Sequence, residues 1–203
     1  DPDLTVTLPP ALTAATGMDA LGHCLEGFLS NNNNPPTEAI ALDGIARVVG
    51  YLDRAVADGN DREARWHMLM AALEGGMSIY MGLGPVHVLG HVFADSPIHH
   101  GALIAASMPP VVRFYRARGD AALNRRLDMV HRAMGLAADV DLATGIAAMN
   151  ARLGLIDSVR ALGYPNDDLD ALAEYAINVH FNATAPVRPS RAEYRDILAE
   201  TLG

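Results

Sequence analysis

The chain has 203 residues, of which 50% are hydrophobic, and a mean hydropathy of +0.12, values typical of a globular protein with one well-buried core. We therefore expect a single domain covering residues 1–203. The net charge is −9, and the 15 basic residues are scattered instead of clustered, which argues against nucleic acid as a partner because phosphate neutralisation needs grouped Lys or Arg.

Apolar residues at helical spacing dominate the first part of the chain. A first helix is predicted to start at Pro9 and Pro10, which suit a first helical turn, and to end near the four Asn at 31–34. A second amphipathic helix covers residues 45–56. We expect Asn60 to cap a third helix, with Glu63 reaching back in a capping box.

The middle of the chain predicts a short helix, a loop and a long apolar helix. Pro85 fits the first turn of the short helix, and Pro97 indicates a loop over residues 95–98. Residues 102–116 are apolar and predict a central helix, which Pro109 and Pro110 should kink or restart. Further helices are predicted over residues 124–134, 142–153 and 169–179, with a last one opening in a capping box at Ser190. The fold class is all-α, a bundle of about eight to nine helices.

The sequence contains no membrane-spanning or secretory segment that we can recognise and only one cysteine. No run of 18 apolar residues exists, and the start, DPDL, has no basic or apolar leader, so we expect neither a membrane span nor a secretory signal. The absence of an initiator Met suggests a fragment. The single cysteine, Cys24, excludes an internal disulfide and fits a reducing cytoplasm.

One carboxylate and several imidazoles have spacings typical of a metal site. Asp19 and His23 are four residues apart, as are His87 and His91, so each pair shares one face of a helix. The predicted loop would bring His100 back to the same place. Imidazole nitrogens with one carboxylate oxygen suit Fe(II) or Zn(II) better than Mg(II) or Ca(II). Paired histidines on a helix are also common as surface or capping residues, and spacing alone leaves both interpretations open.

Several glycine, glutamate and histidine residues have structural roles that explain them without a ligand. Gly82 and Gly84 are interpreted as a tight turn, because no Gly-rich strand-turn-helix unit that could seat a pyrophosphate is present. Glu26 could hydrogen-bond the ring of His23 from one turn away, or could be an exposed carboxylate on the helix surface. Three histidines outside the motifs are interpreted as surface or core residues: His67, His131 and His180.

Two stretches, GMDALGHCLEG at 17–27 and GLGPVHVLGHVFADSPIHHG at 82–101, resemble the C-terminal half of the iron-containing (group III) alcohol dehydrogenase family. The similarity extends over essentially the whole chain and implies the dehydroquinate synthase-like C-terminal α domain. It also implies that the metal ligands are Asp19, His23, His87 and His100, with His91 beside the substrate as a proton-relay and cofactor-contact residue. The segment before His100 is about one residue shorter than the family pattern, which leaves His99 as an alternative ligand.

The same resemblance implies the activity. The complete enzyme would transfer a hydride between a small primary alcohol or aldehyde and NAD(P), with Fe(II), or alternatively Zn(II), polarising the substrate oxygen. The resemblance also implies that the nucleotide is held mainly by an N-terminal domain, which we expect to be absent from this chain, and a second copy of the chain is a further expected partner. Two other functions remain open, a helical metal-dependent hydrolase and a non-catalytic helical interaction module.

Overall fold

The structure, a computed structural model, describes all of residues 1–203 and contains nine α-helices, three short 3-10 helices and no strand. The α-helices are α1 (Pro10–Leu29), α2 (Pro35–Ala57), α3 (Arg62–Ser78), α4 (Pro85–Val92), α5 (His100–Arg118), α6 (Ala121–Ala133), α7 (Leu142–Arg152), α8 (Leu169–Asn178) and α9 (Arg191–Leu202). The 3-10 helices are η1 (Pro2–Leu4), η2 (Ile79–Met81) and η3 (His180–Ala183). The predicted all-α bundle is confirmed.

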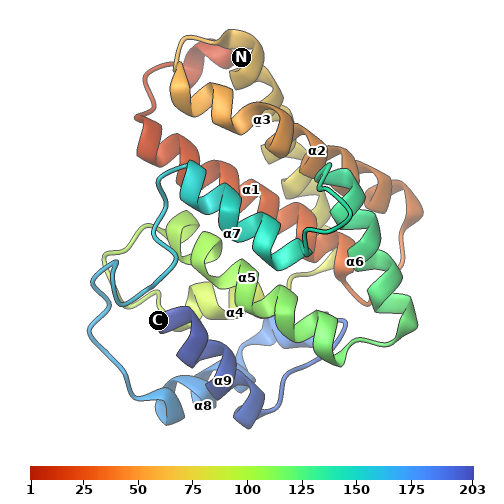
Figure 1. The fold of residues 1–203 in the computed structure, drawn as a ribbon, viewed down its shortest axis with the longest axis vertical. Helices are drawn as coiled ribbons and strands as arrows, with labels where there is room; N and C mark the ends of the chain where they lie inside the picture. Colours follow the sequence, from red (N-terminus) through yellow and green to blue (C-terminus); the bar gives the residue numbers. More distant parts are fainter.

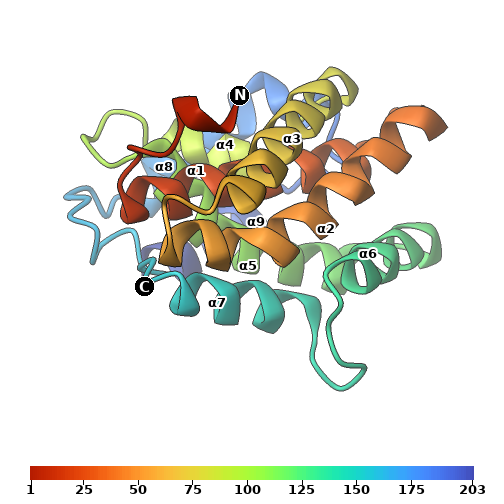
Figure 2. The ribbon, with the colours of Figure 1, turned by 90° about the horizontal axis from the view of Figure 1, so that it is seen from above.

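Helices α1 and α5 form the centre of the bundle. In Figure 1, α2 and α3 cover one side of α1, while α8 and α9 lie at the opposite end of the molecule beyond α5. Seen from above in Figure 2, α6 and α7 lie on one side of α1, and α3 and α4 lie toward the other. The N-terminal part of the chain therefore wraps α1, and the C-terminal part wraps α5.

Burial follows from this arrangement. In α1, 14 of 20 residues are buried, and in α5, 14 of 19, whereas α6 buries only three of its 13 residues. Apolar side chains from both central helices join one core cluster of 45 residues, so burial of apolar surface stabilises all parts of the bundle together. None of the helices combines the length and hydropathy needed to cross a bilayer.

The two prolines inside α5 do not restart the helix. The helix continues from His100 to Arg118, so the predicted restart is wrong. Pro109 has no N–H to donate to the carbonyl of Ala105, one turn earlier. That carbonyl instead accepts a hydrogen bond from the side-chain amide of Asn150 on α7, at 2.8 Å. A buried side chain from a neighbouring helix thus replaces the missing backbone donor.

The predicted capping box at the third helix is also wrong. Asp61, not Asn60, is the N-cap of α3, and its carboxylate accepts from a backbone N–H in the first turn at 3.0 Å. Glu63 does not reach back to the cap and instead pairs with Arg54 of α2 at 2.7 Å. An ionised carboxylate interacts with the positive end of the helix dipole more strongly than a neutral amide does. The capping box at Ser190 is confirmed.

Candidate metal centre

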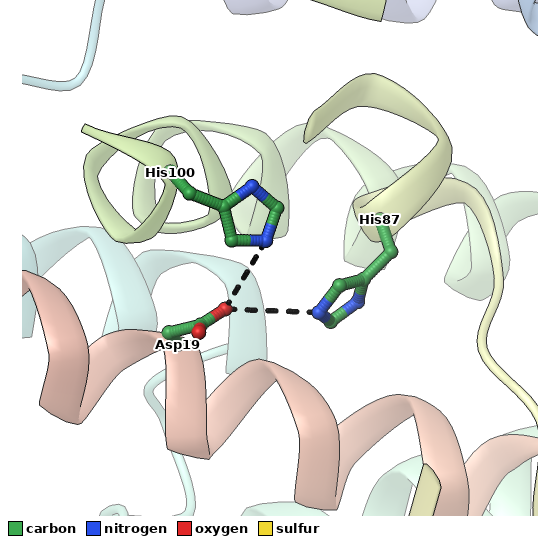
Figure 3. A group of neighbouring side chains, drawn as sticks. All are labelled: Asp19, His87 and His100. Atoms are coloured by element: carbon green, nitrogen blue, oxygen red, sulfur yellow. Dashed lines mark ion pairs between the residues drawn. The ribbon is translucent and has the colours of Figure 1, made fainter. Parts of the chain in front are cut away.

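Three helices bring Asp19, His87 and His100 to one place. Asp19 lies on α1, His87 on α4 and His100 at the start of α5, and Figure 3 shows their side chains pointing toward one another. The Oδ1 atom of Asp19 lies 3.7 Å from Nε2 of His87 and 3.6 Å from Nε2 of His100. The three potential ligand atoms lie within 4.8 Å of one another. Segments more than 60 residues apart in sequence therefore share one cluster of donors.

His23 lies at the edge of this cluster. Its Nε2 is 4.0 Å from Oδ1 of Asp19, one turn earlier on α1. Its ring stacks on the ring of His87, with the centroids 4.6 Å apart and the planes at 18°. It is not among the three residues whose ligand atoms all lie within 4.8 Å of one another. The predicted fourth ligand is thus adjacent to the other three.

Unpartnered buried atoms show that the cluster fits a cation. Oδ1 of Asp19 and Nε2 of His87 are both buried, and neither has a hydrogen-bond partner. Leaving a buried polar atom unpaired costs about 1–3 kcal/mol, so two such atoms side by side are rare in native proteins unless they bind a ligand. An ion held about 2.1 Å from each of two tetrahedral ligands places those ligands about 3.4 Å apart. The observed 3.6 and 3.7 Å are close to that separation.

The start of α5 explains why His100 and not its neighbour faces the cluster. His99 is the N-cap of α5, and its Nδ1 accepts a hydrogen bond from the backbone N–H of Gly101 at 3.1 Å. A Cβ at Gly101 would collide with the backbone carbonyl of Ala15 on α1. Only glycine allows the first turn of α5 to rest on α1 at this point, one turn before Asp19. The loop predicted before His100 is present.

The charges in the cluster shift the pKa values of its members. Burial disfavours the ionised form of Asp19, but the neighbouring His87, His23 and His100 outweigh burial and lower its pKa. Burial lowers the pKa of His23 and that of His100. Burial would also lower the pKa of His87, but contacts with Asp19 and Glu26 raise it to about 9.

His91 lies beside the cluster and not within it. The side chain is on α4, one turn beyond His87, and its ring centroid lies 5.1 Å from that of Phe181 and 6.5 Å from that of His180. Partial burial, followed by the charges of His180 and His87, lowers the pKa of His91. His91 and His180 line an open pocket of about 280 Å³. The 3-10 helix η3 thus forms one wall of the site, which no sequence motif indicated.

Glu26 has a different partner from the predicted one, while His131 and His67 lie outside the site as predicted. Glu26 contacts His87 and not His23: its Oε2 lies 2.7 Å from Nδ1 of His87. The prediction was wrong because α4 packs against this face of α1, which the sequence does not show. His131 lies apart from the site, with Nε2 2.8 Å from the carbonyl oxygen of Val140. His67 stacks on an aromatic ring of α2, away from the site.

Comparisons with known proteins agree with this geometry. The family model for the Fe-containing alcohol dehydrogenase family, C-terminal, matches residues 13–202. A 4-hydroxybutyrate dehydrogenase from Cupriavidus necator is 40% identical over 208 aligned positions, covering 100% of this chain and 54% of the relative. Alcohol dehydrogenase 4 of Schizosaccharomyces pombe is 35% identical, covering 100% of this chain and 48% of the relative.

Solved structures show the same similarity. The crystal structure of a 1,3-propanediol oxidoreductase superposes with a TM-score of 0.89 at 30% identity, covering 99% of this chain and 54% of that chain. An alcohol dehydrogenase from Oenococcus oeni superposes with a TM-score of 0.88 at 29% identity, and the match covers 99% of this chain and 54% of the Oenococcus chain. The chain thus spans about half the length of the relatives that it matches. The chain belongs to the Fe-containing alcohol dehydrogenase family and corresponds to its C-terminal domain.

Proposed function

We propose that this chain is the metal-holding half of an NAD(P)-dependent alcohol dehydrogenase that interconverts a small primary alcohol and its aldehyde. The observation that carries the proposal is the pair of buried, unpartnered atoms that face each other, Oδ1 of Asp19 and Nε2 of His87. The proposed ligands are Asp19, His23, His87 and His100. The ion is Fe(II), with Zn(II) as the alternative that the same donors accept.

The ligand set determines what the ion can do. Three neutral imidazoles and one carboxylate leave a divalent ion with a net charge of +1. When bound, such an ion acts as a Lewis acid that polarises an alcohol or aldehyde oxygen. The chain itself supplies the fixed positions of the donors: His87 and Asp19 lie within the packed bundle, while 46% of the His100 side chain is exposed, so a small substrate can approach from that side.

His91 is proposed to relay a proton and to contact the cofactor. It is exposed on α4, one turn from His87, so its ring can exchange protons with water. Its lowered pKa keeps the ring mostly neutral near pH 7, so Nε2 or Nδ1 can accept a proton released by an alcohol and return it to water. This role needs no direct contact with the ion.

We further propose that residues 1–203 form one domain, completed in the whole enzyme by a nucleotide-binding domain. The single core cluster that joins both halves of the bundle supports the first part. The twofold greater length of the relatives supports the second. The free, buried state of the single cysteine, Cys24, agrees with a cytoplasmic location, which is also part of the proposal.

The family favours alcohol oxidation over the other functions considered for a helical metal site. Membership of an alcohol dehydrogenase family argues against a metal-dependent hydrolase. Two relatives are named for 4-hydroxybutyrate and 1,3-propanediol, which are both small primary alcohols. We propose a substrate of the same size class for the whole enzyme.

Metal analysis tests the proposal directly. The protein is purified without added metal, then loaded anaerobically with Fe(II) or Zn(II), and the bound metal is measured after desalting. We expect close to one equivalent per chain, and loss of that equivalent in Asp19→Asn. Retention below about a tenth of an equivalent, with no gain on loading, would favour a non-catalytic interaction module.

A further inference from the structure

Glu26 is a buried carboxylate next to the proposed ligands. It lies on α1, two helical turns beyond Asp19, so both side chains face α4. Its side chain is only 1% exposed. A buried carboxylate is costly unless every oxygen has partners, so the contacts of Glu26 show what holds it there.

The first turn of α4 supplies three of those partners. Oε2 of Glu26 accepts hydrogen bonds from the backbone N–H groups of Gly84 at 3.0 Å and His87 at 3.1 Å, and Oε1 accepts one from Val86 at 2.8 Å. Gly84 is the N-cap of α4 and has no side chain that could cap the helix. Glu26 on α1 therefore caps the N-terminus of α4 across the interface between the two helices.

The fourth partner is the ring of His87. Its Nδ1 lies 2.7 Å from Oε2 of Glu26. Because both carboxylate oxygens already accept backbone N–H groups, the carboxylate acts as an acceptor, and Nδ1 must be the donor. The other ring nitrogen, Nε2, then faces Asp19 and is the atom available for coordination.

We propose that Glu26 is a positioning residue for the metal centre, which fixes His87 as an Nε2 ligand by accepting its Nδ1–H while anchoring the backbone of the same residue. This inference rests on the proposed function. A carboxylate behind a coordinating imidazole sets the tautomer, fixes the ring plane and strengthens the nitrogen as a donor. Here one carboxylate fixes both the ring and the backbone of His87, so the ligand has little freedom to turn away.

The test compares two substitutions of buried carboxylates. Glu26→Gln keeps the shape but loses the charge, and its amide N–H can face Nδ1, which favours the wrong tautomer. Glu74→Gln is the matched control, because Glu74 is also buried but contacts Arg47 and not the cluster. Zn(II) affinity of the 203-residue chain is measured by competition with a coloured chelator, and folding by circular dichroism.

We expect Glu26→Gln to weaken Zn(II) binding by about 10- to 100-fold and Glu74→Gln to change it by less than about threefold. In a His87→Ala background, adding Glu26→Gln should cause no further loss, because the ligand that Glu26 positions is gone. Wild-type affinity in Glu26→Gln, or an equal loss with and without His87, would overturn the positioning role. If the wild-type chain bound no Zn(II), the proposed function would fall and this inference with it.

A measurement on the unsubstituted protein keeps the inference testable even where Glu26→Gln does not fold. In the Zn(II)-loaded wild-type chain, ¹⁵N-labelled histidine NMR reports which ring nitrogen of His87 carries a proton. We expect a proton on Nδ1 that exchanges slowly with water, and Zn(II) on Nε2. Zn(II) on Nδ1, or no protected proton there, would contradict the assignment.

Discussion

The raised pKa of His87 predicts that the metal-free protein loses stability as the pH rises from about 7.5 to 9. The folded-state pKa of about 9 is above the unfolded value of 6.5, so the folded chain holds a proton that the unfolded chain releases. The resulting stabilisation is fully present below pH 6.5 and is lost as the pH rises through about 9. Between pH 7.5 and 9, linkage gives a loss of roughly 1.5 kcal/mol.

His87 makes the largest contribution to the change in stability in this pH window. Burial raises the pKa of Glu74 to about 7, so this group has largely ionised by pH 7.5. Burial also raises the pKa of the Cys24 thiol from 9.0 to about 12, so ionisation of the unfolded-state thiol removes a further roughly 0.4 kcal/mol by pH 9, with or without His87. The other histidines with shifted pKa values titrate below 6.5.

The assay is urea unfolding of chelator-treated protein at the two pH values. We expect the free energy of unfolding to fall by roughly 2 kcal/mol, of which His87 accounts for roughly 1.5 kcal/mol, in the wild type and in His131→Gln, whose ring lies outside the site. His87→Gln should lose only the roughly 0.4 kcal/mol that comes from Cys24. A wild-type free energy that is the same at both pH values, or a fall of equal size in His87→Gln, would refute the reasoning.

Three further predictions follow from the helix contacts. Gly101→Ala should lower both thermal stability and Zn(II) affinity, because the added Cβ would collide with the backbone of α1. The control Gly76→Ala should change neither, because the space around Gly76 is open. Equal melting temperatures for the two variants would contradict this account. His100→Ala should abolish metal retention, whereas His99→Ala should keep the metal and lose about 0.5–2 kcal/mol of stability as a lost cap, and the reverse outcome would assign the ligand to the other histidine. Asn150→Ala should cost about 1–3 kcal/mol in urea unfolding because a carbonyl in α5 loses its donor, and an unchanged midpoint would show that water replaces it.

Much of the fold could be predicted because helix signals are local. Apolar spacing and helix-starting prolines act within one or two turns, so α1 and α4 were expected near their observed bounds, whereas α2 begins at Pro35, ten residues before the predicted start. The wrong predictions concern helix boundaries and side-chain partners that depend on tertiary contacts. Pro109 does not end α5, because the amide of Asn150 comes from α7, and a sequence read one segment at a time contains no sign of that contact.

In the candidate site too, local pairings could be predicted and contacts between distant segments could not. Helical spacing places Asp19 beside His23 on one face, and that pairing is local. The convergence of α1, α4 and α5 was expected from the loop predicted before His100 and from the family resemblance, because helical periodicity says nothing about contacts between distant segments. The partner of Glu26 was predicted wrongly because one turn of helix suggested His23, while the true partner, His87, is 61 residues away along the chain. The wall formed by η3 had no sequence signal for the same reason.

Anomalous scattering from crystals of the Zn(II)-loaded chain would test the central claim most directly. The account predicts one strong peak between α1, α4 and the start of α5, about 2.0–2.2 Å from an oxygen of Asp19 and from ring nitrogens of His23, His87 and His100. A peak at another place on the molecule, or none between these helices at full loading, would contradict it.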